Sequence, residues 1–206
     1  MPPLRRFNNV PGGMGFIVLE GIDGAGKSVQ AQRLARWLRE RGRSVVETRE
    51  PTDGEWGRRY RAWARGALQA SPEQVLDIFV EDRREHVANV IRPALTAGQL
   101  VVCDRYQAST LAYQTAQGLP EPLVRRRLAA EGSPEPDLTL WLRLPVDQAL
   151  SRIVGAAGER FERAAFLEAV DREYARMDLA AIDAAQPPDT VEQAIRAHVL
   201  PLLEPA

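Results

Sequence analysis

Residues 21–28 match the spacing G-x-x-x-x-G-K-[ST] in full. Glycines in this pattern let backbone N–H groups turn inward around phosphate oxygens, and the positive end of a following helix adds to the same field. Lys27 can reach terminal phosphates as a compact, flexible charge, and the hydroxyl of Ser28 suits a magnesium ion. The motif predicts a site for a nucleoside triphosphate with Mg²⁺. The expected contacts are Gly21, Ile22, Asp23, Gly24, Ala25, Gly26, Lys27 and Ser28.

Three charged residues extend this prediction toward phosphoryl transfer. Lys27 is the only lysine among the 27 basic residues, as expected if the site needs a compact ammonium, although a coding bias that left one lysine is an alternative. Asp104 follows an apolar run and stands where a carboxylate would hold the magnesium shell. Arg105 beside it is a candidate clamp for an acceptor or transferring phosphate, and an ion pair with a local carboxylate is the alternative.

These residues need a scaffold in which strands and helices alternate. Short apolar runs predict strands at 16–20, 44–48, 100–103 and 138–144, with a weaker strand at 181–183. Helical spacing and capping residues predict the helices between them. The predicted helices run from 28 to 42, through 60 and 63, from a capping box at 71 up to Pro93, over 146–153 and 162–177, and onward from Thr190. The alternation predicts an α/β fold of three layers, the P-loop NTPase fold, with a five-stranded parallel sheet flanked by helices and a short lid.

Length and composition are those of a single globular domain without a membrane segment. The chain has 206 residues, 45% of them hydrophobic, a formal net charge of -1 and no apolar run of about 18 residues. We therefore expect one kinase domain over 14–206 after a flexible tail at 1–13, with no membrane and no nucleic acid as partner. A small-residue break at 155–158 predicts the lid, over about 153–163. The single cysteine fits a reducing, cytoplasmic compartment, and the N-terminus lacks the apolar region of a secretory signal.

Several segments together resemble the thymidylate kinase family over almost the whole chain. Residues 104–114 are similar to the family signature D-R-Y-x-x-S-x-x-A-Y-Q, and Arg49-Glu50-Pro51 and the segment 79–83 add to the match. The resemblance implies ATP-dependent phosphorylation of dTMP to dTDP by direct, magnesium-assisted transfer. It also implies a homodimer.

The same resemblance implies roles for individual side chains around dTMP. Phe79 would stack on the thymine ring, and Arg83, four residues later on the same helix, would hydrogen-bond its edge. Packing in the apolar core is the alternative role for Phe79, and also for Tyr113, which would otherwise crowd the ribose 2′ position. The implied contacts to dTMP are Asp23, Glu50, Pro51, Phe79, Arg83, Arg105, Ser109, Tyr113 and Gln114.

On the ATP side the resemblance points to two more arginines. Gly24 leaves the loop without the extra arginine of some family members, so Arg160 of the lid is the implied substitute, with a solvated surface position as the alternative. Arg152 matches a family arginine near the adenine, which residues 184–188 would border. The implied catalytic residues are Lys27, Arg105, Asp23 and Arg160.

Other sequence features carry no predicted role in the chemistry. Residues 125–127, three arginines in a row, are typical of a solvated helix face. His86 and His198 lack metal-ligand spacing, so no transition-metal site is expected. Two functional alternatives remain: a kinase for another deoxynucleotide, and a nucleotide-dependent switch that keeps the P-loop but transfers little phosphate.

Overall fold

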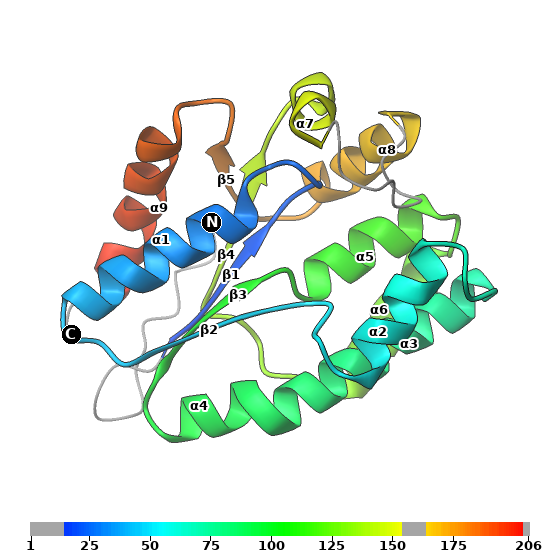
Figure 1. The fold of residues 1–206 in the computed structure, drawn as a ribbon, viewed down its shortest axis with the longest axis horizontal. Helices are drawn as coiled ribbons and strands as arrows, with labels where there is room; N and C mark the ends of the chain where they lie inside the picture. Colours follow the sequence, from blue (N-terminus) through cyan, green and yellow to red (C-terminus); the bar gives the residue numbers. More distant parts are fainter. Residues whose placement is uncertain (1–14, 154–163, 204–206) are drawn as a thin grey trace.

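A computed structural model of the chain describes residues 15–153 and 164–203. Five parallel strands form one sheet in the order β2-β3-β1-β4-β5 (Figure 1). The strands are β1 (Phe16–Glu20), β2 (Val45–Arg49), β3 (Leu100–Asp104), β4 (Leu138–Arg143) and β5 (Ala180–Asp183). The predicted α/β fold with a five-stranded parallel sheet is therefore confirmed.

Helices cover both faces of the sheet. On one face, Ile17 and Leu19 of β1 share a buried cluster with Leu34 of α1 (Lys27–Glu40), and α9 (Pro188–Leu203) packs beside α1. On the other face, Phe16 and Val18 contact a π-helical segment (Val87–Ile91) and α4 (Arg92–Thr96). Because successive strand residues point to opposite faces, β1 is buried along its whole length, as in parallel sheets generally.

The remaining helices gather around the carboxyl ends of the strands and at the edge near β2 and β3 (Figure 1). They are α2 (Glu55–Ala64), α3 (Pro72–His86), α5 (Gln107–Ala116), α6 (Glu121–Glu131), α7 (Val146–Ile153) and α8 (Ala164–Ala175). The capping box at the start of α3 is confirmed, because Ser71 Oγ accepts from the N–H of Gln74 and Gln74 Oε1 accepts from the N–H of Ser71. Both bonds satisfy N–H groups at the helix end.

Two predicted helix boundaries are wrong. The helix starting at Ser71 does not end before Pro93, because the π-helical segment and α4 continue it to Thr96. Pro93 lies in the first turn of α4, where a missing N–H is tolerated. The last helix begins at Pro188 instead of Thr190, since proline is favoured at a first helical position.

Some predictions fall outside the described residues, namely the tail at 1–13 and nearly all of the lid at 153–163. The arginines at 125–127 lie on α6, where Arg125 pairs with Glu121 and Arg127 with Asp77 at half-exposed positions. Among the helices of the described ranges, none is both long enough and apolar enough to cross a membrane.

Candidate active site

The loop between β1 and α1 has the tight backbone that the glycine motif predicts. Gly21, Gly24 and Gly26 have φ values of 143°, 80° and 87°, which side-chain-bearing residues rarely adopt. A Cβ atom at Gly21 would lie 2.6 Å from the carbonyl oxygen of Leu142, and one at Gly24 would lie 2.6 Å from that of Ala149. An arginine at position 24 would therefore collide with the backbone of α7.

Lys27 lies beneath this loop. Its Nζ donates to the carbonyl oxygen of Ile22 over 2.8 Å, and the residue is only 6% exposed. Burial, followed by the neighbouring positive charge of Arg105, lowers the pKa of Lys27 to about 8, although the carboxylates of Asp104 and Asp23 act in the opposite direction. A bound polyphosphate would supply the negative charge that this buried ammonium needs.

Ser28 and Asp104 form the corner at which a cation would bind. Ser28 Oγ donates to Asp104 Oδ2 over 2.5 Å, while Asp104 Oδ1 is buried and has no hydrogen-bond partner in the described structure. Within the described ranges, no group of three or more His, Cys, Asp or Glu side chains could hold a metal ion. The two oxygen donors fit Mg²⁺, which takes few protein ligands and completes its shell with water and substrate phosphates.

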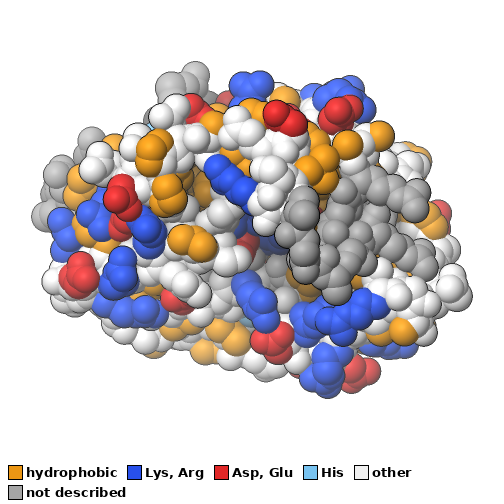
Figure 2. All heavy atoms as spheres, turned by 45° about the horizontal axis from the view of Figure 1, so that its top comes forward, with side chains coloured by type: hydrophobic (Ala, Val, Ile, Leu, Met, Phe, Trp, Pro, Cys, Tyr) orange, Lys and Arg blue, Asp and Glu red, His pale blue; other side chains and the backbone are white. Residues whose placement is uncertain are grey.

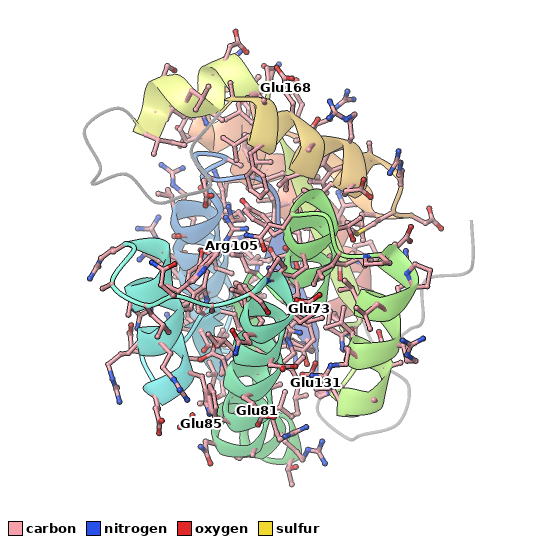
Figure 3. All side chains as sticks on the ribbon, turned by 90° about the vertical axis from the view of Figure 1, so that its right-hand side faces the viewer. Glu73, Glu81, Glu85, Arg105, Glu131 and Glu168 are labelled. Carbon is pink, nitrogen blue, oxygen red and sulfur yellow. The ribbon has the colours of Figure 1, made fainter. Side chains whose placement is uncertain are left out.

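Arg105 joins the loop to α5. It follows β3 with a φ of 70°, and its guanidinium forms an ion pair with Asp23 and donates to the carbonyl oxygen of Gly21 over 3.1 Å. The same guanidinium donates to Ser109 Oγ over 3.0 Å and to Tyr113 Oη over 3.2 Å. Arg105 therefore does form an ion pair with a local carboxylate, the alternative that the sequence left open. The carboxylate belongs to Asp23, which is itself a predicted site residue. Figure 3 shows Arg105 near the centre of the molecule.

Asp23 is the acidic partner in this group. Its Oδ2 accepts from Tyr113 Oη over 3.0 Å. Burial works to raise the pKa of Asp23, but the charges of Arg105 and Lys27 outweigh it and hold the pKa below its ordinary value. Asp23 therefore stays ionised and can orient the arginine.

A cavity of about 230 Å³ opens beside Arg105. Six segments enclose it: the glycine loop, the end of β2, α2, α3, the end of β3 and α5. The predicted site residues that line it are Asp23, Ser28, Glu50, Pro51, Phe79, Asp104, Arg105, Ser109 and Tyr113. Residues from five separate stretches of sequence are thus brought to one cavity.

The position of Phe79 is compatible with both of the roles that the sequence left open. Its ring lines the cavity and also packs against Tyr60, with ring centroids 4.8 Å apart and planes tilted by 46°. The packing fixes the ring, and a fixed aromatic face is what a stacking base requires.

Arg83 lies behind the cavity wall instead of lining it. The residue is 1% exposed, and its Nε and one terminal nitrogen donate to Glu50 Oε2 over 2.9 and 2.7 Å. Further bonds reach Glu131 over 3.4 Å and Thr110 Oγ1 over 2.8 Å. Because arginine only donates, Thr110 accepts here and keeps its own hydrogen available to donate elsewhere.

Glu50 is held on its second oxygen by a histidine. Glu50 Oε1 accepts from His86 Nδ1 over 3.0 Å, and His86 Nε2 lies 2.6 Å from Thr48 Oγ1. The sequence predicted no role for His86, because its spacing from His198 does not fit a metal site. In the structure this histidine is part of the support for Arg83.

Gln114 lies one turn after Thr110 on α5. It is fully buried, and both its Nε2 and its Oε1 lack a hydrogen-bond partner in the described structure. A buried amide that leaves a donor and an acceptor unpaired is costly. Gln114 is not among the residues that line the cavity, so this predicted contact residue lies behind the cavity wall.

On the opposite side of the loop, Arg152 of α7 contacts two backbone carbonyls, that of Gly24 over 3.4 Å and that of Ala184 over 3.3 Å. It therefore connects the phosphate loop with the segment that follows β5. Arg160 falls outside the described residues. Figure 2 shows this face of the molecule, with Lys and Arg side chains distributed around a hollow.

Sequence reasoning missed four residues that line the cavity: Arg49, Tyr60, Arg61 and Thr110. Thr110 lies inside the signature segment at 104–114, so its position was a usable signal. Arg49 and Arg61 are both held by Asp53, with closest distances of 2.9 and 3.2 Å. Arg49 belongs to the segment Arg49-Glu50-Pro51 that adds to the family resemblance, whereas nothing in its local sequence distinguishes Arg61 from other surface arginines.

Comparison with known proteins agrees with this geometry. The family described as thymidylate kinase matches residues 19–195. Thymidylate kinase of Desulfotalea psychrophila is 39% identical over 206 residues, covering 97% of this chain and 100% of the relative. That of Xanthomonas campestris pv. campestris is 42% identical over 199 residues, covering 94% and 86%. That of Akkermansia muciniphila is 47% identical over 152 residues, covering 73% and 70%. The chain belongs to the thymidylate kinase family.

Proposed function

We propose that the protein phosphorylates dTMP to dTDP with ATP, as a thymidylate kinase. The observation that carries this proposal is the cavity of about 230 Å³. It adjoins the phosphate loop through Asp23 and Ser28, and Asp104, Arg105, Phe79 and Thr110 also line it. A nucleoside monophosphate bound there would have its phosphate near the loop and its base away from it.

On the phosphate side, positioning and charge carry the reaction. The acceptor is already a nucleophile, because a phosphate monoester has a second pKa of about 6 and is mostly dianionic at neutral pH. Arg105, oriented by Asp23, would hold that phosphate, and Lys27 would neutralise charge that develops on the transferring group. Ser28 and Asp104 would hold Mg²⁺, which supplies further charge neutralisation and alignment when bound.

On the base side, the unpaired groups suit thymine. Phe79 offers a fixed aromatic face, and the hydroxyl of Thr110 has a hydrogen left to donate. A contact between Gln114 and dTMP is proposed from the family resemblance alone, because this residue does not line the cavity. We propose that Arg83 acts mainly by holding Glu50 and Thr110, and that Tyr113 crowds the ribose 2′ position.

Three further features belong to this proposal. Family membership supports a homodimer, which sedimentation of the purified protein would test. Nucleotide synthesis supports a cytoplasmic location. Arg160 is proposed to reach the phosphates of ATP, because the backbone of α7 leaves no room for an arginine at Gly24.

The test is ADP release from ATP and Mg²⁺ with dTMP, dUMP, dCMP, dGMP or dAMP as acceptor. We expect strong release with dTMP and much weaker release with dCMP and the purine nucleotides. A preference for dCMP or dGMP would instead identify a kinase for that nucleotide. Release that does not depend on any acceptor would identify an ATPase or a nucleotide-dependent switch.

A further inference from the structure

The side chain of Tyr174, near the end of α8, lies behind the candidate active site, where its hydroxyl contacts residues of β1, the glycine loop and α5. It is fully buried, and no predicted role includes it. Its ring stacks on Trp141 of β4, with centroids 6.1 Å apart and planes tilted by 16°. This stacking directs the hydroxyl toward the junction of the phosphate loop and α5.

The Tyr174 hydroxyl meets three groups at that junction. It lies 3.1 Å from Glu20 Oε2, 2.8 Å from Ser109 Oγ and 3.5 Å from the carbonyl oxygen of Gly21. Ser109 Oγ in turn donates to Glu20 Oε2 over 2.5 Å and accepts from Arg105 over 3.0 Å. The hydroxyl is therefore two hydrogen bonds away, through Ser109 Oγ, from the guanidinium proposed to hold the acceptor phosphate.

Glu20 links these contacts to the backbone of α5. Its Oε1 accepts from the N–H groups of Tyr106 and Ser109 over 2.8 and 3.1 Å, so this carboxylate from β1 caps the helix in place of a residue of the helix itself. The capped turn immediately follows Arg105, whose φ of 70° is held in the left-handed region. The orientation of Glu20 therefore bears directly on the backbone that presents Arg105.

Within this group the Tyr174 hydroxyl is the donor that comes from outside β1 and α5. Glu20 Oε2 receives hydrogen bonds from Ser109 Oγ and from Tyr174, and both residues are buried. Without the tyrosine, this oxygen would depend on Ser109 alone, and Ser109 Oγ would also lose a neighbour. Either change loosens the hydroxyl on which Arg105 rests.

We infer that Tyr174 is a positioning residue for phosphoryl transfer, which acts through Glu20 and Ser109 to fix Arg105. The inference rests on the proposed function, because Arg105 must act on the acceptor phosphate for its alignment to matter. Alignment errors lower the rate of the bound complex more than they weaken binding. Tyr174 therefore contributes to kcat and little to either KM.

The test replaces Tyr174 by phenylalanine, which removes one oxygen atom and keeps the stacked ring. We expect kcat for dTMP-dependent ADP release to fall about five- to tenfold, with both KM values within about twofold, as for loss of one hydrogen bond to a charged group. Trp141→Phe is the matched control, because it changes the packing behind Tyr174 and leaves the hydroxyl in place. It should lower the melting temperature and leave kcat within about twofold.

A double-mutant cycle identifies the route of the effect. In a Ser109→Ala background, Tyr174→Phe should lower kcat by no more than about twofold, because the connection to Arg105 is already lost. Equal losses of kcat in Tyr174→Phe and Trp141→Phe, or a full further loss in the Ser109→Ala background, would overturn the inference. Wild-type protein without dTMP-dependent release would overturn the proposed function as well, so the two failures are distinguishable.

Discussion

The two sides of the cavity are held together in different ways. On the phosphate side, Lys27 and Arg105 bond to backbone carbonyls of the glycine loop, and Arg105 also forms an ion pair with Asp23. On the base side, Arg83 is enclosed by side chains, chiefly the buried carboxylate of Glu50. Both sides pair an arginine with a carboxylate, but on the proposed phosphate side the cations also contact the backbone of the loop that would hold a polyphosphate.

This difference predicts different consequences of mutation. A phosphate-side cation stabilises charge that comes with the substrates, so its loss should lower the rate and leave the fold intact. A base-side cation stabilises charge that the protein itself has buried, so its loss should weaken the fold together with dTMP binding. Substitutions on the two sides should therefore differ in whether they change the rate or the stability.

Lys27→Ala should give the largest loss. We expect kcat to fall by about a thousandfold or more, because charge stabilisation in the transition state is removed from a buried site. The melting temperature should stay within a few degrees of wild type, since within the described residues the Lys27 ammonium makes one hydrogen bond, to the backbone of Ile22. A kcat within tenfold of wild type would contradict the role given to this lysine.

Arg83→Met should act mainly on stability. The change leaves Glu50 buried without its cation, and removing one partner of a buried pair costs about 3 to 5 kcal/mol. We expect the free energy of unfolding in urea to drop by about 3 kcal/mol, together with a higher KM for dTMP. If stability is unchanged while kcat collapses, the assignment of Arg83 to the base side is wrong.

Phe79→Ala should raise the KM for dTMP about tenfold and change kcat by less than about threefold, since stacking binds ground state and transition state alike. Steady-state kinetics with dTMP and dCMP would measure both effects. Because Phe79 also packs against Tyr60, the Phe79→Ala variant should have a lower melting temperature than wild type. A KM and base preference equal to those of wild type would leave Phe79 with packing alone.

Arg125→Ala should have the smallest effect. Arg125 pairs with Glu121 over 2.7 Å at a half-exposed position, and such surface pairs contribute about 0 to 1 kcal/mol. Kinetic constants and melting temperature should match wild type. A clear loss of activity would show that this arginine-rich face takes part in function.

The sequence was sufficient to predict the sheet, the glycine loop and the cavity residues whose roles depend on a local motif. Fixed spacing within 21–28 and 104–114 carries that information, because those residues act from one loop and one helix. Arg83 was predicted to contact the base directly, yet its partners Glu50 and Glu131 come from distant segments that only the tertiary fold brings together. Tyr174 was missed for the same reason, since nothing in its own helix marks it.

The helix around Pro93 could not be predicted from the sequence for a different reason. Proline usually ends a helix, and the sequence gives no sign that a π-helical segment precedes it and lets the helix continue. Thr110 could have been predicted as a cavity residue, because it lies in the signature segment. A role for its hydroxyl becomes clear only in the structure, where Arg83 donates a hydrogen bond to it.

The separation of the two sides is tested most directly by calorimetric titration of dTMP and dCMP into the Lys27→Ala variant. We predict that this variant binds dTMP with a Kd within about threefold of wild type and prefers dTMP over dCMP by at least about tenfold. Base recognition would then be independent of the cation that drives transfer. Loss of dTMP binding together with loss of activity would show that the two sides form one unit and would contradict the account.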